Sequence, residues 1–220
     1  MDKSLSSSEY RFLRWNDNNF SYPNLVRIRT ETDGSCLFHA IVKAYFGPYI
    51  RGKMNGQTLD RKSFVRKLRR DLALKLEQRV EPQKPYSKTY YETLSKGDLP
   101  EIAKSIPSYT LKNLQKLLDS TRPVGNIFNE FISNELNKDI YILDLQKKDI
   151  YMTGTDLDIL YKDRDSIVIL YMPGHYELVG VETKLDKTYT DRGNKYIKTL
   201  FKYDHPLIQF IRRRQLQMIS

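Results

Sequence analysis

Residues 32–46 read TDGSCLFHAIVKAYF and decide the fold, because they join a polar turn to an almost wholly apolar segment. The segment 37–46 is too evenly apolar for a surface helix, which keeps one polar face, so it predicts a helix buried on nearly all sides. Gly47 and Pro48 follow it, and a glycine suits a helix end while a proline cannot continue one. Cys36, the single cysteine of the chain, is therefore expected in the first turn of a central helix.

A cysteine in the first turn of a helix has chemistry of its own. Unpaired backbone N–H groups and the positive end of the helix dipole favour the thiolate there over the thiol. Gly34, in the turn before Cys36, leaves room for a substrate backbone to pass close to the sulfur. The pattern indicates a nucleophile. The alternative is an inert core cysteine, which free cysteines often are.

Composition limits the class of protein. The 220 residues suit one domain with extensions, and 40% hydrophobic with 29% charged residues is typical of a soluble globular chain. No apolar stretch is long enough to predict a membrane span, and the first residues lack the pattern of a secretion signal. One cysteine rules out an internal disulfide, and with only three histidines no zinc or other cofactor is expected. The net charge of +10 suits an acidic partner or nucleic acid but does not bear on the fold.

The hydrophobic period changes along the chain from about 3.6 to 2, which predicts helices first and strands later, an α+β fold. Helices are expected over residues 58–80, 87–96, 100–106, 109–119, 125–137 and 206–218. Strands are expected over residues 22–30, 139–145, 166–172, 175–181 and 196–203. We expect an N-terminal extension (1–20) with a short helix over 9–15 capped by Ser8, a main domain (21–181), and a C-terminal extension (182–220) packed on or beside it.

His175 is the histidine best placed to act as a base for Cys36. It follows the predicted turn at Pro173 and Gly174 and begins a strand, so its side chain projects from a rigid edge. Glu177 lies two residues further and therefore on the same face of the strand, where a carboxylate can orient the imidazole. The alternative is a strand histidine with an incidental glutamate beside it.

The other two histidines are weaker candidates. His39 lies three residues after Cys36 on the same helix face, so it reaches along the helix and not across a cleft. Its neighbours are core residues, and a structural role is expected. His205 lies near the end of the chain between Asp204 and Pro206 and is the weakest of the three.

Three separate pieces of the chain resemble the ovarian tumour (OTU) family of cysteine proteases. The stretch DGSCLFHA from Asp33 is similar to the nucleophile signature of that family, and residues 167–179 with Gly174-His175-Tyr176 are similar to its closing strand and catalytic histidine. Between them, Val124-Gly125-Asn126, Glu130 and the stretch KDIYI from Lys138 resemble its middle segment. The resemblance covers about residues 22–181, and the order of the three pieces makes it specific.

The resemblance implies a papain-like fold, with a small central sheet flanked by helices, and a deubiquitinase that cleaves the isopeptide bond after the C-terminal glycine of ubiquitin. It implies Cys36 as nucleophile, His175 as general base and acid, and Asp33 as the acidic residue of the signature. Backbone N–H groups of Asp33, Gly34 and Cys36 would form the oxyanion hole. The implied partners are ubiquitin or polyubiquitin chains, bound by a cytoplasmic monomer. A source in a large DNA virus suits the composition and would mean the host cytoplasm or the virion.

Two positions depart from the family pattern. The family usually has Asp or Asn two residues after the histidine, where this chain has Glu177, so either Glu177 or Asp33 is expected to orient His175. Val124 stands where an aromatic residue is customary.

Other functions remain open from the sequence. One is a catalytically weak OTU-like module that binds ubiquitin, and another is a thiol enzyme for a different acyl substrate. The basic runs 61–70 and 212–214 also suit nucleic acid, although no nucleic-acid motif or stacking aromatic pattern accompanies them, and a solvated helix face explains them equally.

Overall fold

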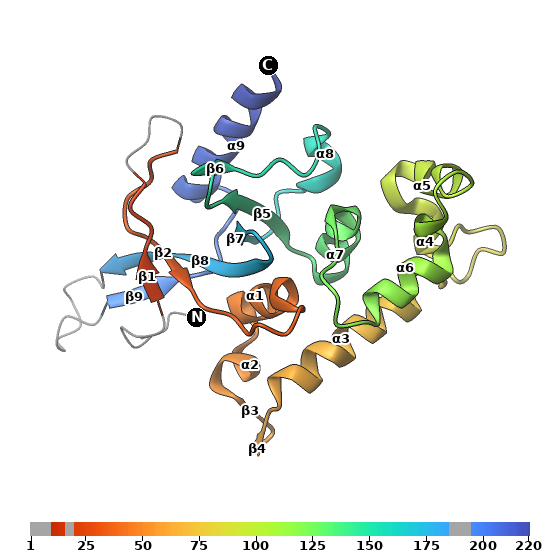
Figure 1. Cartoon of the computed structure of the whole chain (residues 1–220), viewed down its shortest axis with the longest axis horizontal. Helices are drawn as coiled ribbons and strands as arrows, with labels where there is room; N and C mark the ends of the chain where they lie inside the picture. Colours follow the sequence, from red (N-terminus) through yellow and green to blue (C-terminus); the bar gives the residue numbers. More distant parts are fainter. Residues whose placement is uncertain (1–9, 16–19, 185–194) are drawn as a thin grey trace.

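A mixed β-sheet forms the centre of the computed structural model, which describes residues 10–15, 20–184 and 195–220 (Figure 1). Within these residues the sheet has seven strands, in the order β1-β2-β8-β7-β5-β6, with β9 also paired to β8. The strands are β1 (Tyr10–Phe12), β2 (Leu25–Ile28), β5 (Asp139–Asp144), β6 (Asp149–Ile150), β7 (Ser166–Met172), β8 (His175–Lys184) and β9 (Lys195–Lys198). Only β5 and β7 run parallel, and the remaining pairs of the sheet are antiparallel.

The tight turn between β7 and β8 forms as its sequence predicts. Gly174 has a φ of +77°, a backbone conformation that residues with a side chain rarely adopt, and Pro173 precedes it. The turn pairs Met172 with His175, so β8 begins at the histidine. His175 is thereby held at one end of the sheet.

Helices lie on both sides of the sheet and beyond it. They are α1 (Cys36–Tyr45), α2 (Gly47–Arg51), α3 (Arg61–Lys75), α4 (Tyr90–Thr93), α5 (Asp98–Ile102), α6 (Leu111–Leu118), α7 (Asn129–Leu136), α8 (Leu157–Leu160) and α9 (Pro206–Ile219). Short 3-10 segments are η1 (Leu94–Gly97), η2 (Pro107–Tyr109) and η3 (Asn126–Phe128), and β3 (Lys53–Met54) pairs with β4 (Gln57–Thr58) as a separate hairpin. In Figure 1 α3 runs beside α6, and α4 to α6 lie away from the sheet.

The alternation of side chains along the strands creates two cores. On β7, Ile167 and Ile169 face α1, while Val168 and Leu170 face α9. Helix α1 has eight of its ten residues buried, which confirms the expectation of a helix enclosed on nearly all sides. The core on the side of α9 also contains Leu13, Trp15, Phe20, Tyr141, Val179, Leu207, Ile208 and Ile211.

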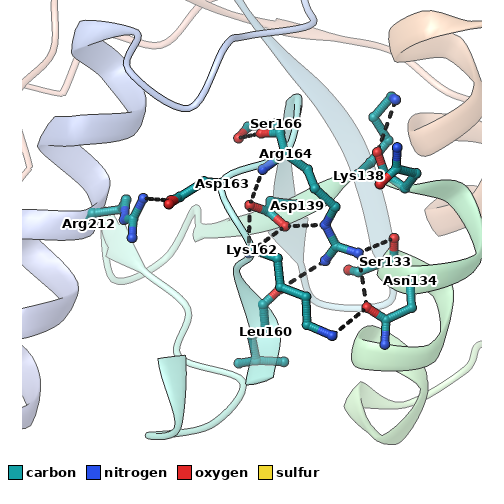
Figure 2. A network of polar contacts seen from close by, with 11 residues as sticks. Ser133, Asn134, Lys138, Asp139, Leu160, Lys162, Asp163, Arg164, Ser166 and Arg212 are labelled. Atoms are coloured by element: carbon teal, nitrogen blue, oxygen red, sulfur yellow. Dashed lines mark hydrogen bonds and ion pairs between the residues drawn. The ribbon is translucent and has the colours of Figure 1, made fainter. Parts of the chain in front are cut away.

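A polar network fastens the start of β5 to the segments around it (Figure 2). Asp139, fully buried, accepts hydrogen bonds from the backbone N–H groups of Lys162 and Arg164 and from the Arg164 Nε at 2.7 Å. Arg164 also donates to the Ser133 carbonyl and to the Asn134 side chain. Because β5 and β7 are parallel and His175 follows the end of β7, this network lies at the end of β5 and β7 away from His175.

The α+β prediction is confirmed, with several corrections. The helix expected over 87–96 is only α4, followed by η1 with Ser95 and Lys96 at positive φ, and the strand expected over 196–203 ends at Lys198. The helix expected over 9–15 is wrong: Tyr10 to Phe12 form β1, because the edge of β2 offers unpaired backbone groups that a peripheral helix would leave unused. The range 58–80 gives a shorter helix, which Asp60 caps by accepting from Lys62 and Ser63 N–H. Gly47 and Pro48 end α1 but also begin α2. Finally, Arg69 was expected on a polar face of α3 and is buried.

Elements that the sequence did not predict are the hairpin, β6 and α8, each only two to four residues long. Such short elements contain too few residues for a hydrophobic period to be visible. Within the described ranges no helix is both long and apolar enough to cross a membrane.

Candidate active site

Cys36 begins α1, where the turn after Asp33 meets the start of β8. Only 3% of the residue is exposed, so solvent reaches the sulfur poorly in this conformation. The backbone N–H groups of Tyr176, Leu37 and Cys36 itself stabilise negative charge on the sulfur. Tyr176 directly follows His175, so α1 brings the nucleophile of the sequence prediction to the strand that carries the predicted base.

Burial has the largest effect on the Cys36 thiol and raises its pKa above the ordinary value of 9.0. The three backbone N–H groups lower the pKa but do not offset burial, and the negative charge of Asp33 raises it further. The helix-end stabilisation expected from the sequence is therefore present but is not the dominant effect. Cys36 is a thiol at neutral pH in this conformation.

This protonation state gives a testable pH dependence. Alkylation of the native chain by iodoacetamide is expected to speed up with pH about tenfold per unit, without levelling off below about pH 9, because only the thiolate reacts. The rate is measured by mass spectrometry, and Cys36→Ala, which leaves no cysteine, is the blank. A plateau below about pH 7.5 would show instead that the free protein already stabilises the thiolate.

His175 is partly buried at the first position of β8. Its Nε2 lies 3.5 Å from the Thr30 Oγ1, and that hydroxyl donates to the Tyr176 carbonyl at 2.5 Å. In the part of the chain that the structure describes, no hydrogen bond joins the Cys36 sulfur to His175. The fold brings the segments of the predicted catalytic pair together without a direct bond between them, and their roles remain a prediction.

Glu177 is engaged by a residue that the sequence analysis did not consider. Only 4% of Glu177 is exposed, and its Oε2 lies 3.0 Å from the Arg27 Nε of β2. The contact is an ion pair whose geometry falls short of a hydrogen bond at that oxygen. Along β8 the neighbours Tyr176 and Leu178 pack on the side of α1, so strand alternation places Glu177, and His175 two residues before it, on the other face of the strand.

Asp33 is held within its own turn. It accepts hydrogen bonds from the Ser35 N–H at 3.0 Å and from the His39 Nε2 at 3.1 Å. His39 is fully buried, and its other ring nitrogen lies 2.6 Å from the Tyr49 hydroxyl. Partial burial raises the pKa of Asp33, but the bonds from His39 and Ser35 outweigh it, so the pKa is lowered and the carboxylate stays ionised.

His39 has a structural role, because it is buried and bonded to Asp33 and close to the Tyr49 hydroxyl. The two candidates for the residue that orients His175, Asp33 and Glu177, both have other partners. Asp33 is bonded to His39 and Glu177 is paired with Arg27, and among the described residues no hydrogen bond or ion pair joins either carboxylate to His175. The predicted oxyanion donors Asp33, Gly34 and Cys36 lie in the turn before α1, where Gly34 has a φ of +76°. Within the described ranges no group of three or more His, Cys, Asp or Glu side chains could hold a metal ion.

A buried cysteine lies at the amino end of a central helix, and that helix packs against a strand that begins with histidine in a mixed sheet covered by helices. Comparison with solved structures finds similar folds. An ovarian tumour (OTU) domain solved in complex with ubiquitin matches with a TM-score of 0.51 and 20% identity, covering 89% of this chain and 85% of that one. The chain therefore has the fold of OTU domains, as its sequence motifs predicted.

Two further solved structures match less closely. They are the OTU domain of OTUD1, with a TM-score of 0.42, 17% identity and 71% of this chain against 85% of that chain, and an OTU deubiquitinase from Wolbachia pipientis wMel, with a TM-score of 0.40, 11% identity and 78% against 94%. No protein-family model and no curated protein matches the sequence.

Proposed function

We propose that this protein is a deubiquitinase that hydrolyses the isopeptide bond after the C-terminal glycine of ubiquitin, with Cys36 as nucleophile and His175 as base. The observation that carries the proposal is the buried Cys36 at the start of α1, against Tyr176 and next to the histidine that opens β8, in an OTU fold. The OTU domain that matches with a TM-score of 0.51 was solved in complex with ubiquitin, which supports ubiquitin as the partner.

The mechanism starts from a protonated thiol. His175 accepts the proton of Cys36, and the thiolate attacks the carbonyl carbon of the C-terminal glycine of ubiquitin. Backbone N–H groups of the turn around Gly34 and Cys36 stabilise the oxyanion that forms. His175 then gives the proton to the departing lysine amine, and water hydrolyses the thioester to release ubiquitin and the free thiol.

This mechanism requires a movement of the two catalytic side chains before the first proton transfer. Because no hydrogen bond joins Cys36 and His175 in this conformation, where the His175 Nε2 lies 3.5 Å from the Thr30 Oγ1, the imidazole and the sulfur have to come closer before a proton can pass between them. Reorientation of a catalytic side chain on substrate binding is common, since catalytic hydrogen bonds often tighten only in the complex. We propose that Glu177 or Asp33 orients the ring in that state.

A ubiquitin probe with a C-terminal electrophile tests the proposal. The native chain is expected to gain the mass of one ubiquitin, and Cys36→Ala is expected to gain none. Because Cys36 is the only cysteine, no other thiol can replace it. A folded native sample that forms no adduct after prolonged incubation would contradict the proposal. If that sample still bound ubiquitin, the chain would be a binding module of the OTU fold.

The structure weakens the alternative of nucleic-acid binding, which depends on an exposed basic surface over residues 61–70. Arg61 donates to the Tyr49 and Ile50 carbonyls, and Arg69 is buried, so two of the cations counted toward a basic surface on α3 serve internal contacts. A buried or internally bonded arginine does not neutralise phosphates.

A further inference from the structure

Arg69 is the most completely enclosed cation among the described residues, with 1% of its surface exposed. It lies on α3, and its guanidinium is 4.9 Å from the centre of the Phe38 ring of α1. Its Nε donates to the Leu118 carbonyl at 2.8 Å, its Nη1 to the Ser35 Oγ at 2.8 Å and the Gly34 carbonyl at 3.5 Å, and its Nη2 to the Leu117 carbonyl at 3.1 Å and the Arg122 carbonyl at 2.8 Å. Every nitrogen of the guanidinium has an acceptor.

These acceptors belong to two separate segments. Gly34 and Ser35 form the turn directly before Cys36, and the other three carbonyls come from the end of α6 and the loop after it. The loop also contacts the turn directly, because a side chain on Gly34 would begin 2.0 Å from the Thr121 carbonyl oxygen. Ser35 is the N-cap of α1 and makes no capping bond with its side chain, so its hydroxyl is available to Arg69.

We propose that Arg69 is a positioning residue for the reaction, which fixes the turn of Gly34 and Ser35 so that the backbone N–H of Cys36 faces the developing oxyanion. This inference rests on the proposed hydrolase function of Cys36. An oxyanion hole requires donors that are already in place when charge develops, and a displacement of about 1 Å is costly. The turn before α1 has a glycine at positive φ, so it depends on outside contacts for its shape.

Arginine suits this position better than lysine. Its planar fork offers five N–H donors in a fixed geometry and stays charged when buried, whereas a lysine ammonium is a compact group that cannot reach both segments at once. Burial lowers the pKa of Arg69, while the nearby Asp33, Asp119 and Cys36 raise it. Burial has the larger effect, so the pKa of Arg69 is lowered overall, but a guanidinium still stays charged at neutral pH and its charge lies beside the turn that precedes Cys36.

The test compares Arg69→Lys with Arg164→Lys. Arg164 is a matched control, because it is also largely buried and bonds a carboxylate, a carbonyl and a side-chain oxygen (Figure 2). It differs in its place, because it lies at the end of β5 and β7 away from His175. With a ubiquitin substrate, Arg69→Lys is expected to lower kcat at least about thirtyfold with KM within about threefold, since the turn acts in the transition state. Arg164→Lys is expected to keep kcat within about threefold.

Hydrogen exchange gives a second readout that does not require ubiquitin. The peptide covering residues 31–38 is expected to exchange at least about tenfold faster in Arg69→Lys and at the native rate in Arg164→Lys. Unchanged exchange in folded Arg69→Lys, or an equal loss of kcat in both variants, would overturn the proposal. A native chain without activity on ubiquitin would contradict the proposed function alone, since the exchange comparison still tests Arg69.

If Arg69→Lys does not fold, Ser35→Ala replaces it as the test, because it removes one acceptor and leaves the arginine with its other four. Faster exchange of the peptide 31–38 at native thermal stability is the expected result. Native exchange in Ser35→Ala would then contradict the role of Arg69.

Discussion

Alanine at His175 is expected to lower kcat on a ubiquitin substrate by about a thousandfold or more, while ubiquitin binding and the folded state remain. The reason is the protonation state of Cys36. Burial raises the pKa of this thiol, so the reaction needs a base that removes its proton. The turn after β7 begins β8 at His175, and the next residue, Tyr176, has its backbone N–H at the Cys36 sulfur. Steady-state turnover of a fluorogenic ubiquitin conjugate gives kcat and KM separately.

His205→Ala is the matched control for this experiment. His205 is also a partly buried histidine, but it caps α9 by accepting from the Leu207 N–H. Its loss is expected to cost about 1 kcal/mol of stability, as for other N-caps, with kcat unchanged. If His175→Ala retained more than about a tenth of native turnover, another group would have to deprotonate Cys36.

Local sequence patterns predicted the elements that carry the site. The turn at Asp33 and Gly34, the apolar run after Cys36 and the Pro-Gly turn before His175 are each decided by fewer than fifteen neighbouring residues. Turn chemistry and hydrophobic period act over that range. For this reason the bounds of α1, of β7 and of the start of β8 were predicted within one or two residues.

The side-chain partners could not be predicted in the same way. The Arg27–Glu177 pair joins residues 150 positions apart, and the pairing of Asp33 with His39 depends on how the turn bends back on α1. Spacing along one strand identified Glu177 as a candidate but could not show that β2 would supply an arginine to it. Long-range contacts of this kind follow from the tertiary fold and not from the local pattern.

The burial of Arg69, unlike the pairings above, follows from a local pattern in the sequence. It lies four residues after Val65 and three before Leu72, which are both buried, so the helical period assigns it to the inner face of α3. Its charge led to the opposite expectation, because charged residues are rarely buried unless they are paired or hydrogen-bonded. An arginine in the apolar register of a helix is therefore a sign that the fold will supply carbonyl acceptors.

Gly34→Ala is expected to destabilise the protein by more than about 3 kcal/mol. Gly34 has a φ of +76°, where an L-residue costs about 1–2 kcal/mol, and a Cβ would begin 2.0 Å from the Thr121 carbonyl oxygen. That oxygen is backbone and cannot move aside as a flexible side chain would. The turn or the loop after α6 must shift, which adds the cost of overpacking. Free energies of unfolding from urea titrations measure the effect.

Gly56→Ala separates the two contributions. Gly56 has a φ of +80° in the turn between β3 and β4, and a Cβ there would meet nothing within 4 Å. Its replacement therefore carries only the backbone cost, so a difference of at least about 2 kcal/mol between the variants measures the contact of Gly34 with Thr121. Similar losses of unfolding free energy in both variants would mean that the loop after α6 moves aside at little cost. Because the same contact fixes the turn before Cys36, the folded fraction of Gly34→Ala is also expected to lose at least about a hundredfold in kcat, and Gly56→Ala none.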